Sequence, residues 1–157
     1  MNVYASTLII GIGNPLRSDD GLGWAVAEHL SQERHPNCAI HMVHQLTPDV
    51  AQWMANASLV VMVDASHEGK PGELHVRPLS PSAQPGAIGT HHTTPEELAA
   101  LTTIIYGHCP PVMLVSMTGA DFGIGERLSS IVAKRLPLVI KATLLLHPQA
   151  PVLRHPR

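Results

Sequence analysis

The run Leu59–Val63 is apolar at every position, and it constrains the fold more than any other feature of the sequence. A strand in which apolar and polar residues do not alternate is covered on both faces, which is typical of a parallel sheet in an α/β protein. The run ends in Asp64. Because ligands of open α/β sheets bind beyond the carboxyl ends of the strands, Asp64 lies where a ligand site is expected.

A glycine-rich turn near the start of the chain also follows a predicted strand. The apolar run Thr7–Ile10 predicts a buried strand and Trp24–Leu30 predicts a helix, with the turn Gly11–Gly23 between them. Asp19 and Asp20 lie in this turn, at or just before the start of the helix, where exposed amide groups stabilise negative charge. The turn is therefore expected to carry two ionised carboxylates.

The chemistry of this turn favours a cation over a phosphate. Paired acids repel an anion, and the dinucleotide-binding pattern requires a glycine where this sequence has Leu16. If the first and third predicted strands are neighbours in the sheet, Asp20 and Asp64 converge on one crevice. The alternative is that Asp64 only caps a loop.

The remaining patterns continue the alternation of strands and helices. The predicted elements are a strand at Ala39–His44, a short helix with Pro48 as its first residue, strands at Leu74–Val76 and Met113–Met117, and a C-terminal helix from Leu128 that Pro137 kinks or splits. The fold class is thus α/β, with a three-layer, mostly parallel twisted sheet flanked by helices, of the phosphorylase/hydrolase-like kind. We expect residues 1–147 to form a single domain and residues 148–157 to form a flexible tail rich in Pro and His.

Two adjacent histidines follow the longest predicted loop. Residues 78–90 contain three prolines, two glycines and two serines and should form a loop that leads to His91 and His92. A helix is predicted directly afterwards, because Thr94–Glu97 is a capping box with Pro95 at the first helical position. Near a helix N-terminus the neutral imidazole is favoured, and this is the form that binds metals.

Composition and charge exclude several classes of protein. The formal net charge of −2 without a basic stripe argues against a nucleic-acid partner. No apolar run approaches the roughly 20 residues of a spanning helix, and no basic segment followed by an apolar one opens the chain, so we expect no membrane insertion and a cytoplasmic location. Cys38 and Cys109 form no CxxC motif and are expected to be free packing residues.

Two carboxylates and an imidazole from three separate loop ends would suit a divalent first-row metal such as nickel, zinc, manganese or iron. Three protein ligands leave a position open for substrate or water. From the residues alone, two other interpretations stay open. The acids could simply support the fold, or the turn could belong to a nucleotide site.

The turn Gly11–Gly23 resembles the signature of the nickel-iron hydrogenase maturation proteases, the endopeptidases that trim the C-terminus of the hydrogenase large subunit. Other similar features follow in the order of that family: a strand ending in Asp64-Ala65, then Thr90-His91 before a helix that contains Glu97-Leu98, and a late loop at Asp121–Ser129. The resemblance covers roughly residues 6 to 145.

The resemblance implies that Asp20, Asp64 and His91 are the metal-binding and catalytic residues, with His91 preferred to His92 because it lies six residues before Glu97. It implies a nickel ion already seated in the large-subunit precursor as the recognition element, for which another divalent metal could act as a surrogate. We expect the protein to be a monomer. Asp20 stands where the family often has Glu, and it is still a hard oxygen donor.

Several roles stay open at this level. The metal could polarise the scissile carbonyl or activate water, or a carboxylate could act as general base or nucleophile. Asp19 is expected to cap or support the turn, and Arg17 to orient Asp20 or neutralise a substrate carboxylate. The segment His44–Pro48 replaces a glycine-rich turn of the family, at a place expected to contact the partner.

Two rival functions are a metal-binding chaperone that docks without cutting and a peptidyl-tRNA hydrolase-like enzyme. The second family shares the opening Gly11–Pro15, but this chain then has Ser18-Asp19-Asp20 instead of that family's catalytic histidine and asparagine.

Overall fold

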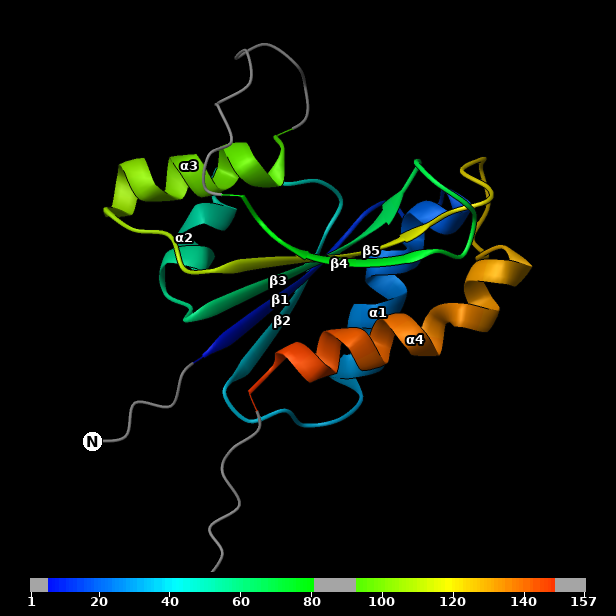
Figure 1. Ribbon diagram of the computed structural model, residues 1–157, viewed down its shortest axis with the longest axis horizontal. Helices are drawn as coiled ribbons and strands as arrows, with labels where there is room; N and C mark the ends of the chain where they lie inside the picture. The colour runs from blue at the N-terminus through cyan, green and yellow to red at the C-terminus, as the bar shows by residue number, and fades with distance from the viewer. Residues whose placement is uncertain (1–5, 81–92, 149–157) are drawn as a thin grey trace, which may run out of the picture.

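A twisted sheet of five strands runs through the centre of the protein (Figure 1). The structure, a computed structural model, describes residues 6–80 and 93–148. In the order β2-β1-β3-β5-β4, the first four strands are parallel to one another and the edge strand β4 is antiparallel to β5. The strands are β1 (Thr7–Ile12), β2 (Cys38–Val43), β3 (Leu59–Ser66), β4 (Leu74–Pro78) and β5 (Val112–Thr118).

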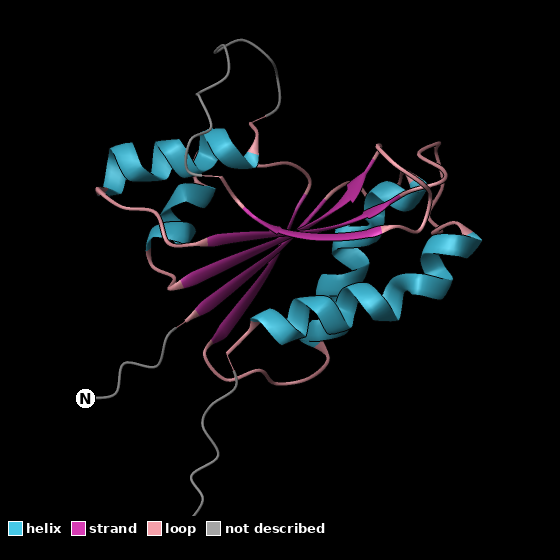
Figure 2. Cartoon of the chain, in the orientation of Figure 1, coloured by secondary structure: helices cyan, strands magenta, loops and turns pink. Residues whose placement is uncertain are grey.

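Helices cover both faces of this sheet and make three layers (Figure 2). On one face lie α1 (Leu22–Ser31) and α4 (Ser130–Leu146), and on the other lie α2 (Val50–Ala55) and α3 (Pro95–Tyr106). A short 3-10 helix, η1 (Ser18–Gly21), precedes α1 and contains both acids of the glycine-rich turn. No helix within residues 6–80 and 93–148 has the length and apolar character needed to cross a membrane.

The two faces of β1 show why the sheet is buried on both sides. Leu8 and Ile10 pack with residues of α2 and α3, including Met54 and Leu98, whereas Ile9 belongs to the core formed with α1 and α4. Successive side chains of a strand point to opposite faces, so an apolar run without alternation supplies both cores. The α/β class and the mostly parallel, helix-flanked sheet are confirmed.

The position of β3 next to β1 is the feature that matters most for function. The two strands pair in parallel from Thr7 opposite Leu59 to Gly11 opposite Val63. Asp64 follows at once, on the part of β3 that extends beyond the pairing with β1. The condition that the first and third strands are neighbours is therefore met, and it brings Asp64 to the end of the sheet where the glycine-rich turn begins.

The start of α3 was predicted correctly at the level of single hydrogen bonds. The backbone N–H of Glu97 donates to the Thr94 hydroxyl at 3.1 Å, and the N–H of Thr94 donates to the Glu97 carboxylate at 3.1 Å. This reciprocal pair satisfies two amide groups that a helix N-terminus otherwise leaves without partners.

One prediction about proline was wrong, and a second was wrong in part. Pro48 lies in a turn closed by the bond from Val50 N–H to the Thr47 carbonyl, so α2 begins two residues later, after Asp49. Helix α4 is not split at Pro137, since loss of one N–H is tolerated in a long helix held by packing on the sheet. The kink at Pro137 stays a prediction. The predicted tail from residue 149 and the segment 81–92, with His91 and His92, lie outside the described residues.

Candidate active site

A cleft of about 610 Å³ opens at the carboxyl ends of β1, β2 and β3. This is the place where ligands of open α/β sheets bind. Its lining includes both predicted acids, Asp20 and Asp64. The other lining residues are Ile12, Gly13, Asn14, Arg17, His44, Gln45, Leu46, His67, Thr93 and Pro95. The structure thus brings together two of the three predicted site residues.

The glycine-rich turn wraps closely around Asp20. Gly13 has a φ of 139°, and a Cβ atom there would lie 1.8 Å from the backbone oxygen of Asp20. The N–H of Asn14 donates to the Asp20 carboxylate at 2.8 Å. Only glycine therefore fits at position 13, and the turn holds the Asp20 carboxylate by its backbone.

Asp64 lies in an environment that disfavours its negative charge. Burial raises the pKa of this carboxyl from its usual 3.8 to about 7, and the nearby charge of Asp20 adds to the effect. The hydrogen bond from the N–H of Ala65, at 2.8 Å, opposes it only in part. Two carboxylates that repel each other in one cleft would both be stabilised by a cation, or by a proton shared at the site.

Asp19 points away from this chemistry and is fully buried, with an exposed fraction of 0%. Burial alone would raise its pKa, but the hydrogen bonds it accepts outweigh burial and hold the pKa below the usual value. The donors are the hydroxyl and N–H of Ser129 and the N–H groups of Ala120 and Asp121, at 2.7–3.0 Å. Asp19 therefore ties the turn to the loop after β5, which agrees with a supporting role rather than that of a ligand.

Arg17 and its neighbours extend this connection between the two loops. Ser18 N–H donates to the Gly125 carbonyl at 2.8 Å, and Gly125 N–H donates to the Leu16 carbonyl at 2.9 Å. The Arg17 Nε donates to the Phe122 carbonyl at 3.4 Å. The guanidinium is thus anchored to the late loop at the edge of the cleft, and the acid turn and the late loop form one framework.

Two histidines of the cleft wall each contact an aromatic ring. His44 meets Trp24 edge-on with ring centroids 4.9 Å apart, and His67 stacks on Phe122 at 3.7 Å. His44 was predicted to lie in a segment that contacts the partner, whereas no role was predicted for His67 or Phe122. Its position three residues after Asp64, at the same end of the sheet, could have indicated that His67 lies in the site.

The third predicted ligand, His91, lies outside the described residues, and so does the alternative ligand, His92. Thr93, which follows them directly, lines the cleft. Within residues 6–80 and 93–148 no group of three or more His, Cys, Asp or Glu side chains is placed to hold a metal. The set of Asp20, Asp64 and His91 stays a prediction.

A second hollow of about 380 Å³ lies where α3 faces the residues before β5. It contains one carboxylate, Glu96, and the thiol of Cys109. The neighbouring His108 directs its ring nitrogens at the carbonyls of Tyr106 and Ala55, and the Cys109 thiol donates to the Pro110 carbonyl. Cys109 is thus not activated by His108, and both Cys38 and Cys109 are free thiols whose pKa values are raised by burial.

Comparison with solved structures shows which known proteins this fold resembles. The NiFe hydrogenase maturation protease HycI from Thermococcus kodakarensis KOD1 is 26% identical, with a TM-score of 0.72 over 90% of this chain and 92% of that chain. The chain resembles the hydrogenase maturation proteases. No family model and no curated protein matches the sequence.

Two more distant maturation proteases have the same fold. The hydrogenase-maturating endopeptidase HybD from E. coli is 18% identical, with a TM-score of 0.71 over 89% of this chain and 90% of that chain. The hydrogenase 2 maturation peptidase from Thaumarchaeota archaeon SCGC_AB-539-E09 is 24% identical, with a TM-score of 0.68 over 89% of this chain and 96% of that chain. The resemblance first noted in the glycine-rich turn therefore extends over nearly the whole fold.

Proposed function

We propose that this protein is an endopeptidase that removes the C-terminal extension of a nickel-iron hydrogenase large-subunit precursor after nickel insertion. The observation that carries the proposal is the convergence of Asp20 and Asp64 in one cleft, on the fold of the maturation proteases. We also propose that it acts in the cytoplasm as a monomer.

Nickel enters this reaction as part of the substrate. Two carboxylates and an imidazole are a donor set that suits Ni²⁺, and the mutual repulsion of Asp20 and Asp64 favours a cation between them. The third donor in the proposal is His91. Two residues of chain span at most about 7 Å, so the position of Thr93 on the cleft wall allows His91 to reach the acids. Binding of the ion by these ligands would restrict cleavage to precursor that already contains nickel.

The reaction itself is the hydrolysis of one peptide bond. A water molecule adds to the scissile carbonyl carbon, and a carboxylate of the cleft accepts its proton. The carbon–nitrogen bond then breaks, and the proton passes to the nitrogen of the released extension.

The test is a processing assay with purified protein and precursor. Nickel-loaded precursor should be shortened, as mass spectrometry would show, and nickel-free precursor should stay intact. Asp20→Asn, Asp64→Asn and His91→Ala should each lower the rate at least about 100-fold. Asp49→Asn, which changes an exposed carboxyl outside the cleft lining, is the matched control and should process normally.

The same assay distinguishes an endopeptidase from the main alternative, a metal-binding chaperone. A metal-binding chaperone would hold the nickel-loaded precursor in a stable complex and leave it uncut. Calorimetric titration of Ni²⁺ into the wild type and the three variants then tests each ligand. A variant that binds nickel as tightly as the wild type would show that its residue is not a ligand.

A further inference from the structure

The wall of the cleft beside Asp64 contains an imidazole that the proposed chemistry does not use. His67 lines the cleft together with Asp20 and Asp64, three residues beyond Asp64 in the chain. Its side chain is exposed to solvent. Within residues 6–80 and 93–148, neither of its ring nitrogens has a hydrogen-bond partner. The ring is stacked on that of Phe122.

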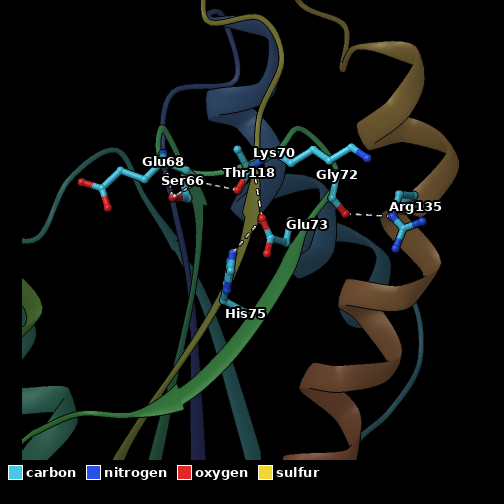
Figure 3. Close-up of polar contacts among 8 residues, drawn as sticks. All are labelled: Ser66, Glu68, Lys70, Gly72, Glu73, His75, Thr118 and Arg135. Carbon is cyan, nitrogen blue, oxygen red and sulfur yellow. Dashed lines mark hydrogen bonds and ion pairs between the residues drawn. The ribbon is translucent and has the colours of Figure 1, made fainter.

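Hydrogen bonds hold the loop that carries His67 near both of its ends (Figure 3). The Thr118 hydroxyl of β5 donates to the Glu68 carbonyl at 2.6 Å, directly after His67. At the other end of the loop, the Arg135 side chain of α4 donates to the Gly72 carbonyl at 2.8 Å. The loop backbone is therefore held against the sheet and against a helix.

Phe122 is fixed independently of that loop. Its carbonyl accepts from Arg17 Nε, and the preceding residue, Asp121, donates its N–H to the buried Asp19. Gly119 leaves room for the phenyl ring, because a Cβ atom there would lie 2.5 Å from Cζ of Phe122. The ring of His67 is stacked on this support with an interplanar angle of 19°.

A ring whose face is covered in this way has its edge left for other contacts. A neutral imidazole carries one donor and one acceptor on that edge, which matches the N–H and C=O groups of an extended peptide. The stack joins two separately anchored loops, so its geometry exists before substrate arrives and little order has to be gained on binding.

We infer that His67, supported by Phe122, is a substrate-binding residue that hydrogen-bonds the backbone of the precursor segment lying in the cleft. This inference rests on the proposed endopeptidase function and adds a specific subsite to it. The subsite recognises an extended peptide next to the scissile bond, and it takes no part in proton transfer or in holding nickel.

The test compares KM and kcat for nickel-loaded precursor among three variants. His67→Ala removes both the stack and the ring nitrogens, and His67→Phe keeps the stack but removes the nitrogens. Both should raise KM about three- to tenfold, the effect of one lost hydrogen bond, with kcat within about twofold of the wild type. The matched control is His75→Ala, at an exposed histidine outside the cleft lining, and its KM should be unchanged.

The KM values show whether His67 binds the substrate or only shapes its loop. If His67→Phe has the KM of the wild type while His67→Ala does not, the histidine only shapes the loop and the inference is overturned. It is also overturned if both variants match the wild type. If the wild-type protein does not cut nickel-loaded precursor at all, the proposed function fails, and the inference fails with it.

Discussion

Replacement of Asp64 by Asn should stabilise the folded protein above neutral pH while it abolishes processing. Asn keeps the oxygen that accepts the 2.8 Å hydrogen bond from Ala65 and removes the charge that the site disfavours. The pKa of Asp64 is 3.8 in the unfolded chain and about 7 in the folded protein, and each pH unit of that difference corresponds to about 1.4 kcal/mol. The free energy of unfolding of Asp64→Asn should therefore exceed that of the wild type by no more than about 4 kcal/mol.

The sign and the pH range follow from where the proton is bound. Below pH 3.8 the carboxyl of Asp64 is protonated in both the folded and the unfolded protein. Between pH 3.8 and about 7 only the folded protein keeps the proton, so the stability of the wild type falls as the pH rises. Above about pH 7 the loss is complete, because the carboxyl is ionised in both states.

The assay is thermal or denaturant unfolding of the wild type and Asp64→Asn, from pH 4 to pH 8. The stability difference should grow across this range and then level off, reaching about 8–16 °C in Tm if the full effect is realised. Asp20→Asn should reduce the difference slightly, because the charge of Asp20 adds to the raised pKa of Asp64. A difference of the same size at pH 4 and pH 8 would refute this reasoning.

Two further changes test the framework around the acids. Asp19→Ala should lower the free energy of unfolding by about 3–5 kcal/mol at pH 7, because it removes a buried carboxylate that accepts hydrogen bonds from Ala120, Asp121 and Ser129. Ser129→Ala, the milder comparison, should cost about 2 kcal/mol, and a loss below 1 kcal/mol for Asp19→Ala in urea titrations would contradict the role given to this residue. Gly13→Ala should displace Asp20 and abolish processing of the precursor, because its Cβ would lie 1.8 Å from the Asp20 backbone oxygen. Gly107→Ala, also at positive φ but with no atom within 4 Å of the added Cβ, should cost only about 1–2 kcal/mol and keep activity, and equal activities of the two variants would contradict the prediction.

Local patterns predicted most of the secondary structure. An apolar run without alternation indicated that the strand at Leu59–Val63 is covered on both faces, and both cores confirm it. The capping box at Thr94 placed the start of α3 correctly, because its hydrogen bonds join residues three apart in the chain. Pro48 was misjudged as the first residue of a helix because a turn outweighed its local preference. Pro137 does not split α4 because the packing of a long helix outweighs the local preference of proline.

Part of the site could also be predicted before any coordinates. All strands of a parallel sheet end at the same edge, so an acid at the end of one strand and an acid in the turn after another are expected at the same edge. This argument predicted that Asp20 and Asp64 share a crevice, on the condition that β1 and β3 are neighbours. The resemblance of the glycine-rich turn to the maturation proteases pointed to the same residues.

The sequence by itself determined the elements and the edge of the sheet at which the chemistry would lie, because these depend on periodicity and on residues close together in the chain. Only the tertiary structure decided that β3 lies beside β1, that Asp19 holds a loop more than 100 residues away, and that His67 stacks on Phe122. Those contacts join segments far apart in the sequence. Their partners are chosen by the packing of the whole sheet and its helices, and no local pattern encodes that choice.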